Sequence, residues 1–301
     1  MDLWFLHVAN QTLIHPTVDG VMAMLTIGSL LVFPLVGWGL VRAQRQRLGW
    51  TLLAALLGSL LFTLLFYYLA LRPRPSDVRL LLPTPPFPAY PSGHTAMAFS
   101  MVVVLALAVR RWWVTVLAVV LATLVSFSRI YLGHHYPSDV VGGAVLGSAL
   151  GASVYGLFYG GHSLVARLQW LVWTQIAIVF MGTQMAYLDL LPGGLLRWPY
   201  ADKVLHGLLF GAVVFWLNLW LMDRRFTYRH WSVPLAILIP FTLALLEEGA
   251  QAFSPLRSSD ITDLASDLIG MLCFWWLSKQ LLAREPTDDL PLGEPGNLAI
   301  S

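Results

Sequence analysis

Residues 128–139 read SRIYLGHHYPSD and separate two long apolar runs, at roughly 113–131 and 139–159. Each run is long enough to cross the hydrocarbon core of a bilayer, which takes about 20 apolar residues in a helix. The stretch between them holds one arginine, two adjacent histidines and an aspartate, and Pro137 stands where proline often starts a helix. The pattern predicts two membrane helices joined by a short segment rich in titratable groups.

The second of these runs carries a regular stripe of small residues. Gly143, Gly147 and Gly151 recur at every fourth position, so they share one face of the predicted helix. Such a stripe lets a neighbouring helix approach closely. We therefore expect this helix to pack tightly and to hold Asp139, at its start, against the core.

The whole chain has the composition of a membrane protein. Of its 301 residues, 57% are hydrophobic and 11% are charged, and the mean hydropathy is +0.70. A soluble domain carries about 25% charged residues. We predict an all-α polytopic fold with about nine spans, at roughly 20–41, 50–71, 94–109, 113–131, 139–159, 169–190, 204–222, 231–250 and 263–283. Residues 1–17 are too short and too polar to span, and we expect them along the membrane interface.

Charge patterning predicts the orientation of these spans. Basic clusters occur in alternate loops, as RAQRQR (42–47), RR (110–111) and DRRFTYR (223–229), and they predict that these loops lie in the cytoplasm, as in a bacterial inner membrane protein. The segment SRIYLGHHYPSD then faces the periplasm or exterior. A net charge of +2 gives no reason to expect nucleic acid as a partner. The single cysteine, Cys273, excludes an intrachain disulfide, and the N-terminus MDLWFLHVANQ lacks the basic residues of a cleaved signal peptide.

Three polar pieces are expected to meet at the outer ends of the second to fifth spans. They are LRPRP (71–75), PSGH (91–94) and SRIYLGHHYPSD (128–139). Their arginines suit an oxyanion such as phosphate, and a helix that starts after PSG offers free backbone N–H groups to the same ligand. Arginines at span ends also snorkel to lipid headgroups, and Ser92, His94 and Asp139 allow a serine-hydrolase reading. PSGH is not a nucleophile elbow, however, and the three arginines favour a phosphoryl group.

These pieces resemble the signature of the type 2 phosphatidic acid phosphatase (PAP2) family, whose helical core is shared with the vanadium haloperoxidases. The family pattern has a lysine, six residues and Arg-Pro; then Pro-Ser-Gly-His; then Ser-Arg, five residues, His, three residues and Asp. The second and third elements match in full at 91–94 and 128–139. In the first, Arg74-Pro75 puts Tyr67 in the lysine position and Arg72-Pro73 puts Leu65 there, so the lysine is absent in either register. The resemblance covers about residues 1–160.

The resemblance implies a role for each matching residue. His135 would be the nucleophile that forms a phosphohistidine, Asp139 would orient it, and His94 would protonate the leaving group. The implied phosphate ligands are Arg72, Arg74, Ser92, Gly93 and Arg129. The same register makes His134 a solvated loop residue whose replacement by alanine should spare most activity. No metal or other cofactor is implied, because the arginines supply the positive charge.

The implied substrate is a lipid phosphate embedded in the membrane. Undecaprenyl diphosphate or another isoprenoid diphosphate, phosphatidylglycerol phosphate and phosphatidic acid all fit this expectation, and the sequence names no protein partner. Two other readings stay open. Because the lysine is missing, the chain would also suit a lipid-phosphate binding or transport protein with a vestigial site. A phosphotransferase would share the first chemical step and pass the phosphoryl group to another lipid or a sugar.

A second set of polar residues follows in the last spans. Its members are Asp202, Lys203, His206, Glu248, Gln251, Arg257, Asp263 and Asp267. Mutual pairing at the water boundary explains them as well as a functional site does. The pieces DKVLHG (202–207), EGAQ (248–251) and PLRSSDITDL (255–264) resemble the four-span VanZ-like family, which commonly has asparagine where Asp267 stands. We therefore expect a phosphatase domain at 1–160, a VanZ-like domain at 168–283 and a disordered cytoplasmic tail at 284–301.

Overall fold

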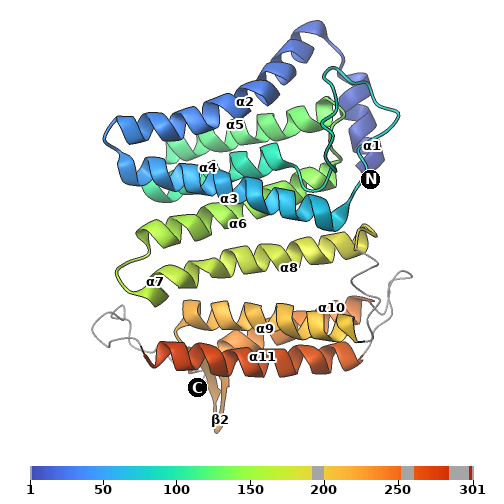
Figure 1. Ribbon diagram of the computed structural model, residues 1–301. Coiled ribbons are helices and arrows are strands. Elements are labelled where there is room, and N and C mark those ends of the chain that lie inside the picture. Colours follow the sequence, from blue (N-terminus) through green and yellow to red (C-terminus); the bar gives the residue numbers. More distant parts are fainter. Residues whose placement is uncertain (1, 192–199, 252–260, 285–297, 300–301) are drawn as a thin grey trace. The chain divides into compact units, whose positions relative to one another are not determined.

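The computed structural model describes residues 2–191, 200–251, 261–284 and 298–299. By its internal contacts the chain divides into two units. The first comprises Met1–Phe158 and Phe180–Leu191, and the second comprises Tyr159–Val179 and Pro192–Ser301. Each unit has its own hydrophobic clusters and is built almost entirely of helices (Figure 1).

The first unit is an up-and-down arrangement of long helices. It begins with α1 (Asp2–His7) and a π-helical turn (Val8–Thr12), and continues with α2 (Pro16–Arg42), α3 (Gln46–Ala70), α4 (Gly93–Val109), α5 (Trp112–Tyr131) and α6 (Pro137–Tyr159). Pro16 and Pro137 start their helices, and Leu71 ends α3 in the left-handed conformation (φ 46°). The ends of α3 and α5 and the starts of α4 and α6 lie near α1 (Figure 1). The three polar pieces of the sequence thus come to one end of the bundle.

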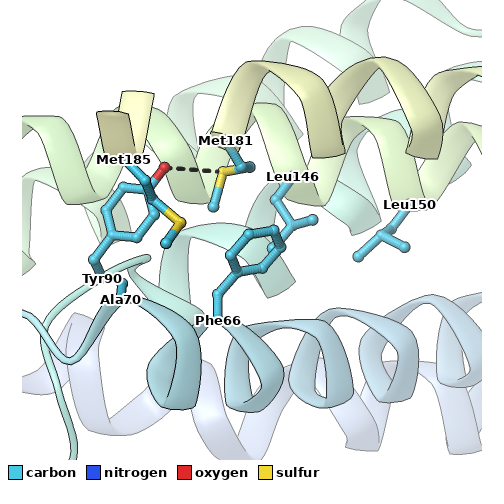
Figure 2. Packing of buried hydrophobic residues seen from close by; sticks show 7 residues of the cluster. All are labelled: Phe66, Ala70, Tyr90, Leu146, Leu150, Met181 and Met185. Carbon is cyan, nitrogen blue, oxygen red and sulfur yellow. Dashed lines mark hydrogen bonds between the residues drawn. The ribbon is translucent and has the colours of Figure 1, made fainter. Parts of the chain in front are cut away.

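A buried cluster fixes the loop that joins α3 to α4. Phe66, Tyr90 and Leu146 pack with Met181 and Met185 of α8 (Val172–Tyr187), as Figure 2 shows. The Tyr90 hydroxyl also donates to Gln184 Oε1 at 2.8 Å, and Tyr90 itself has no exposed surface. The loop end that leads into PSGH is therefore anchored to α6 and α8 by apolar burial and one buried hydrogen bond.

The glycine stripe of α6 lies directly against the backbone of α4, which confirms the predicted close packing. A Cβ built on Gly143 would stand 2.5 Å from the carbonyl oxygen of Ser92, and one on Gly151 would stand 2.6 Å from that of Ser100. At Gly147 the added carbon would overlap the carbonyl oxygen of Ala96. Any side chain at Gly147 would separate α6 from α4, and the two helices carry opposite walls of the polar site.

We expect Gly147→Ala to destabilise the protein by about 1–3 kcal/mol or more, because overpacking against a fixed backbone forces the helices apart. Gly58→Ala is the matched control, since a Cβ at Gly58 meets no atom within 4 Å. Alanine there should be neutral or slightly stabilising, because it has the higher helix propensity. Thermal unfolding midpoints of both variants in detergent test the pair, and equal midpoints would contradict the packing described above.

The second unit contains α7 (Leu164–Leu168), a 3-10 turn (Gln169–Leu171), the first part of α8, α9 (Ala201–Leu221), α10 (Leu235–Gln251) and α11 (Ile261–Leu282). Helices α9 and α11 pack so closely that a Cβ on Gly270 would overlap the carbonyl oxygen of Gly207. A small sheet has the order β2-β1-β3, from β1 (Arg225–Tyr228), β2 (Trp231–Pro234) and β3 (Leu298–Ala299). β1 pairs antiparallel with β2, with Phe226 opposite Val233, and parallel with β3.

The predicted all-α membrane architecture is confirmed. Within the described residues, six helices are long and apolar enough to cross a membrane, namely Pro16–Arg42, Gln46–Ala70, Trp112–Tyr131, Pro137–Tyr159, Leu164–Tyr187 and Ala201–Leu221. Two shorter apolar helices are Gly93–Val109 and Leu235–Leu246. The chain is therefore an integral membrane protein, and the count of nine spans stays a prediction.

One predicted boundary is wrong. The span expected at 231–250 begins at Leu235, because Trp231–Pro234 pairs with Arg225–Tyr228 in a hairpin rich in aromatic and β-branched residues. The tail predicted to be disordered, 284–301, lies largely outside the described residues, so its disorder stays a prediction; within it, the described pair Leu298–Ala299 forms β3.

The N-terminal segment packs on the first unit, and its expected place along the membrane interface stays a prediction. Leu6 and Ala9 are buried in a cluster with Ile130. The Asn10 side chain donates to the carbonyl oxygens of Arg79, at 2.9 Å, and Tyr131, at 2.7 Å. The segment is thus held beside the polar site by two buried apolar side chains and by the hydrogen bonds of Asn10.

Candidate active site

His135 occupies the centre of the polar end of the first unit. It follows α5 and is only 1% exposed. Its Nδ1 lies 2.8 Å from the carbonyl oxygen of Ala89. Because a carbonyl oxygen can only accept a hydrogen bond, Nδ1 carries the ring proton and Nε2 keeps its lone pair. Nε2 lies 3.4 Å from Arg74 Nη1. Burial holds the pKa of His135 well below its usual range, and the nearby charges of Arg129 and Arg74 act in the same direction. The imidazole is therefore neutral, with its nucleophilic nitrogen unprotonated.

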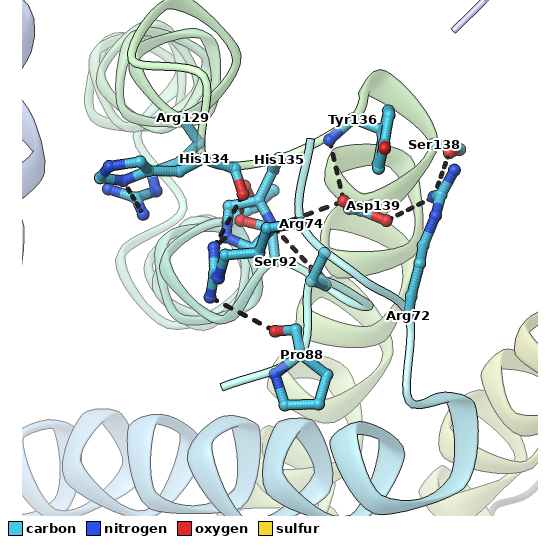
Figure 3. Close-up of polar contacts among 12 residues, drawn as sticks. Arg72, Arg74, Pro88, Ser92, Arg129, His134, His135, Tyr136, Ser138 and Asp139 are labelled. Carbon is cyan, nitrogen blue, oxygen red and sulfur yellow. Dashed lines mark hydrogen bonds and ion pairs between the residues drawn. The ribbon is translucent and has the colours of Figure 1, made fainter. Parts of the chain in front are cut away.

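Asp139 lies beside this histidine at the start of α6, with no exposed surface. Its Oδ2 is 3.5 Å from His135 Nδ1 and accepts a hydrogen bond from the Tyr136 N–H at 2.8 Å. Its Oδ1 accepts from Arg72 Nη1 at 2.5 Å (Figure 3). A carboxylate in this place can stabilise positive charge that develops on the imidazole when Nε2 forms a bond.

Arg72 has a different place from the one predicted, among the phosphate ligands. Besides Asp139, its guanidinium donates to Ser138 Oγ at 2.7 Å and to Asp2 Oδ2 at 3.2 Å, and it lies 4.1 Å above the Tyr136 ring. Two carboxylates therefore neutralise Arg72 and it orients Asp139. Asp2 escaped sequence analysis because it joins this network only through the packing of α1, and no local pattern links it to Asp139.

Arg129 and His134 form a buried pair. Arg129, 1% exposed, donates from Nη2 to His134 Nδ1 at 2.8 Å, and His134 Nε2 donates in turn to the carbonyl oxygen of Leu82 at 3.2 Å. The prediction that His134 is a solvated loop residue is wrong, because the loop that carries Leu82 covers it to 2% exposure. His134 orients Arg129, so its replacement is no longer expected to spare activity.

Arg74 is held by backbone carbonyls and has no carboxylate partner among the described residues. It donates to the carbonyl oxygens of Phe87 (2.9 Å), His134 (2.7 Å) and Pro88 (3.3 Å), as Figure 3 shows in part. Burial lowers the pKa of Arg74 from its ordinary value, but the group stays charged. Its positive charge beside His135 Nε2 is thus available to an anion.

The PSGH piece supplies the facing wall. The Ser92 N–H donates to the backbone carbonyl of Asp139 at 2.9 Å, so it is committed to the fold. Ser92 Oγ accepts from Thr95 Oγ1 at 3.1 Å, which leaves the Ser92 O–H as a donor. Gly93 and His94 start α4. Within the described residues, His94 Nε2 and Arg129 Nε are buried polar nitrogens without a hydrogen-bond partner. Such atoms are costly unless a ligand completes them.

The comparison with protein families agrees with this geometry. Residues 48–182 match the PAP2 superfamily, and residues 158–283 match VanZ/LLP1. Residues 48–182 thus form a PAP2-type region, fused to a VanZ-like region. Both resemblances inferred from motifs are confirmed.

Curated relatives of the PAP2 region include two named enzymes. The lipid A 4'-phosphatase of Bacteroides thetaiotaomicron is 39% identical over 80 residues, which is 27% of this chain and 34% of that protein. The undecaprenyl-diphosphatase of Sulfolobus acidocaldarius is 32% identical over 139 residues, 44% of this chain and 66% of that protein. The chain thus spans one third to two thirds of these relatives. A crystal structure of a transmembrane PAP2 type phosphatidylglycerolphosphate phosphatase from Bacillus subtilis aligns with a TM-score of 0.46 at 27% identity, over 52% of this chain and 83% of that one.

The second polar cluster, in the VanZ-like region, is partly assembled. Lys203 pairs with Asp202 at 3.2 Å and with Asp263, and His206 Nδ1 lies 3.2 Å from Asp267 Oδ1. These residues join α9 to α11, and Asp267 is buried. The side chains of Glu248, Gln251 and Arg257, also predicted for this cluster, lie outside the described residues. The described members therefore act at least as a structural ion-pair set between two helices.

The two buried histidines of the PAP2 region predict an acid-sensitive fold. Burial first, and then the charge of Arg129, lowers the pKa of His134 from 6.5 to about 4, and that of His135 is also lowered. As the pH falls below about 6.5, the unfolded chain binds protons that the folded chain does not, so stability decreases by about 1.4 kcal/mol per pH unit for each histidine. The loss is complete once the pH passes below the folded-state pKa values.

We expect thermal unfolding midpoints in detergent to fall between pH 7 and pH 5, and the fall to be smaller in His134→Gln. His162→Gln is the control, because His162 is exposed and should leave the wild-type pH dependence unchanged. An undiminished fall in His134→Gln would show that His134 is not buried in its neutral form.

Proposed function

We propose that the PAP2 region is a metal-independent phosphatase that hydrolyses a phosphate group on a membrane lipid through a phosphohistidine. The observation that carries the proposal is the presence, near an unprotonated His135 Nε2, of two buried nitrogens that have no hydrogen-bond partner among the described residues, Arg129 Nε and His94 Nε2. A tetrahedral oxyanion supplies the acceptors that these nitrogens lack. Family membership and the named activities of the relatives support the same reaction class.

In the first step, the lone pair of His135 Nε2 attacks phosphorus while the bond from phosphorus to the leaving oxygen breaks. His94 carries a proton when the anionic substrate is bound beside it and gives this proton to the leaving oxygen. Arg74, Arg129, the Ser92 O–H and the Gly93 N–H hold the three remaining oxygens. The imidazole of His135 becomes positively charged, and Asp139, oriented by Arg72, stabilises that charge.

In the second step, water attacks the phosphohistidine from the side that the leaving group has vacated. His94, now neutral, takes a proton from this water as the new P–O bond forms and the N–P bond breaks. The electron pair returns to His135 Nε2, and inorganic phosphate leaves. His135 is thereby restored in its starting tautomer, with Nδ1 still bonded to Ala89.

We further propose that the active site faces the periplasm or exterior of a bacterial inner membrane. The basic clusters at 42–47 and 110–111 lie at the end of the first unit's helices opposite to the active site, and positive loops are retained in the cytoplasm. Residues 1–160 and 168–283 are the proposed limits of the two domains. A site at the end of membrane helices suits a substrate whose acyl or isoprenoid tail stays in the bilayer.

The experiment is a phosphate-release assay in detergent micelles with undecaprenyl diphosphate, phosphatidylglycerol phosphate, phosphatidic acid and a 4'-phosphorylated lipid A, combined with trapping of acid-labile labelled phosphoenzyme. Release together with a trapped phosphohistidine supports hydrolysis. Labelled phosphoenzyme whose phosphate passes only to added lipid or sugar acceptors would make the protein a phosphotransferase. Lipid binding without label or release would make it a binding protein with a vestigial site.

A further inference from the structure

The position where the PAP2 pattern has lysine is occupied by a tyrosine that lies beside the candidate active site. Two registers were open, with Tyr67 or Leu65 in that position. Leu65 is 51% exposed on the outside of α3, whereas the Tyr67 hydroxyl interacts with the Arg74 guanidinium and lies 3.7 Å from the point that a Cβ on Gly93 would occupy. The structure therefore favours the register with Tyr67 in the lysine position, and the Tyr67 ring stacks on Phe87 with centroids 6.2 Å apart and planes at 15°.

Thr63, one helical turn earlier, continues the same polar strip of α3. Its side chain is 2% exposed, and its Oγ1 has no hydrogen-bond partner among the described residues. A Cβ placed on Gly93 would lie 3.8 Å from Thr63 Oγ1 and 3.7 Å from Tyr67 Oη. Both hydroxyls thus surround the start of α4, where the proposed phosphate would lie. A Cβ on Gly93 would also lie 3.2 Å from Thr63 Cγ2, which is closer than an ordinary contact.

Fewer positive charges are available to a ligand at the site than the number of its arginines implies, because some of these arginines are paired with carboxylates. Arg72 pairs with Asp139 and Asp2, and Arg79 forms two hydrogen bonds with Asp19, at 2.8 and 2.9 Å. Arg74 and Arg129 are the guanidiniums near His135 without a carboxylate partner within the described part of the chain. A lysine at position 67 would add a third cation, but the tyrosine adds a neutral donor.

We propose that Tyr67 contacts the phosphoryl group and determines which lipid phosphate the site prefers. Because its hydroxyl is neutral, the site contains two cations, and two cations match the dianion of a lipid phosphomonoester better than the larger charge of a diphosphate. The inference rests on the proposed function. A diphosphate brings a further negative charge on its second phosphate, and with no third cation that charge is stabilised less in a buried site than in water. The hydroxyl is retained as a hydrogen-bond donor to an equatorial oxygen.

The test uses two substrates with the same tail, farnesyl phosphate and farnesyl diphosphate, and three variants. Tyr67→Phe should lower kcat/KM for the monophosphate about ten-fold, the effect of one lost hydrogen bond to the transferred group. Tyr67→Lys should raise the ratio of diphosphate to monophosphate kcat/KM by about ten-fold or more, since one charged contact contributes more than a neutral one. The adjacent Tyr68, 78% exposed, provides the control, and Tyr68→Phe should change neither value.

Unchanged kinetics in Tyr67→Phe, or an unchanged substrate ratio in a folded Tyr67→Lys, would overturn the proposal. If Tyr67→Lys does not fold, Tyr67→Phe decides alone. If the wild type releases no phosphate and forms no phosphohistidine, it is the proposed function that fails. Affinity for inorganic orthovanadate, measured by equilibrium dialysis, then tests Tyr67 separately: weaker binding in Tyr67→Phe than in Tyr68→Phe supports its place in the pocket, and equal binding overturns it.

Discussion

His135→Ala should abolish phosphate release, with a loss on the order of 10⁵-fold in kcat, because nothing else in the site can form the covalent bond to phosphorus. The reason is geometric. The hydrogen bond from His135 Nδ1 to the carbonyl oxygen of Ala89 fixes the orientation of the ring. It leaves a lone pair on Nε2, next to the charge of Arg74. Neither His94 nor His134 can replace it, since His94 lies on α4 and both ring nitrogens of His134 are occupied by Arg129 and Leu82.

The measurement is inorganic phosphate release from a lipid phosphate that the wild type turns over, together with label retained on the denatured protein. His162→Ala serves as the control, because it removes an exposed histidine from the same chain and should keep wild-type rates. If His135→Ala still forms labelled phosphoenzyme, another residue is the nucleophile and the assignment of His135 is wrong.

Asp139→Asn should lower kcat by roughly 10²–10⁴-fold while the protein remains folded, by analogy with the loss of an orienting carboxylate beside a catalytic histidine. Asp139 Oδ2 lies 3.5 Å from His135 Nδ1, and its negative charge offsets the positive charge of the phosphorylated imidazole. The neutral amide cannot do this, and it also leaves Arg72 with one carboxylate partner instead of two. Formation of the phosphohistidine should therefore slow more than substrate binding weakens.

Asp77→Asn is the matched control for this change. Asp77 lies exposed in the loop between α3 and α4, in a left-handed conformation (φ 56°) that asparagine also adopts. The same loss of one negative charge there should leave kcat and the unfolding midpoint unchanged. Equal activity of Asp139→Asn and Asp77→Asn would show that His135 does not need the carboxylate.

The electrostatics of the site follow from how its charges are paired. The charge of Arg72 is balanced by Asp139 and Asp2, so Arg72 orients Asp139 beside His135. Arg74 and Arg129 are instead oriented by uncharged groups, namely backbone carbonyls and the His134 ring. Uncompensated guanidiniums in a buried site attract an anion strongly, because little water screens them. This division of the arginines explains why the site can bind phosphate and still keep a carboxylate next to its nucleophile.

Much of the fold and of the site was predictable from local patterns. Apolar runs of about 20 residues identify membrane helices, because a bilayer tolerates few charges and no unpaired backbone groups. The stripe of Gly143, Gly147 and Gly151 predicted the contact of α6 with α4. The match of PSGH and SRIYLGHHYPSD to the family pattern singled out His94, His135 and Asp139, and all three lie at one end of the first unit.

What the sequence determined by itself was thus the helical membrane architecture, since it depends on composition and on the length of apolar segments, and the candidate reactive residues, which the family pattern implied within short segments. The tertiary structure decided their partners. It buried His134 against Arg129, turned Arg72 toward Asp139 and Asp2, and placed Tyr67 rather than Leu65 beside Arg74. These contacts join residues far apart in the chain, and they exist because helix packing and the loop between α3 and α4 bring those residues together, which no local pattern encodes.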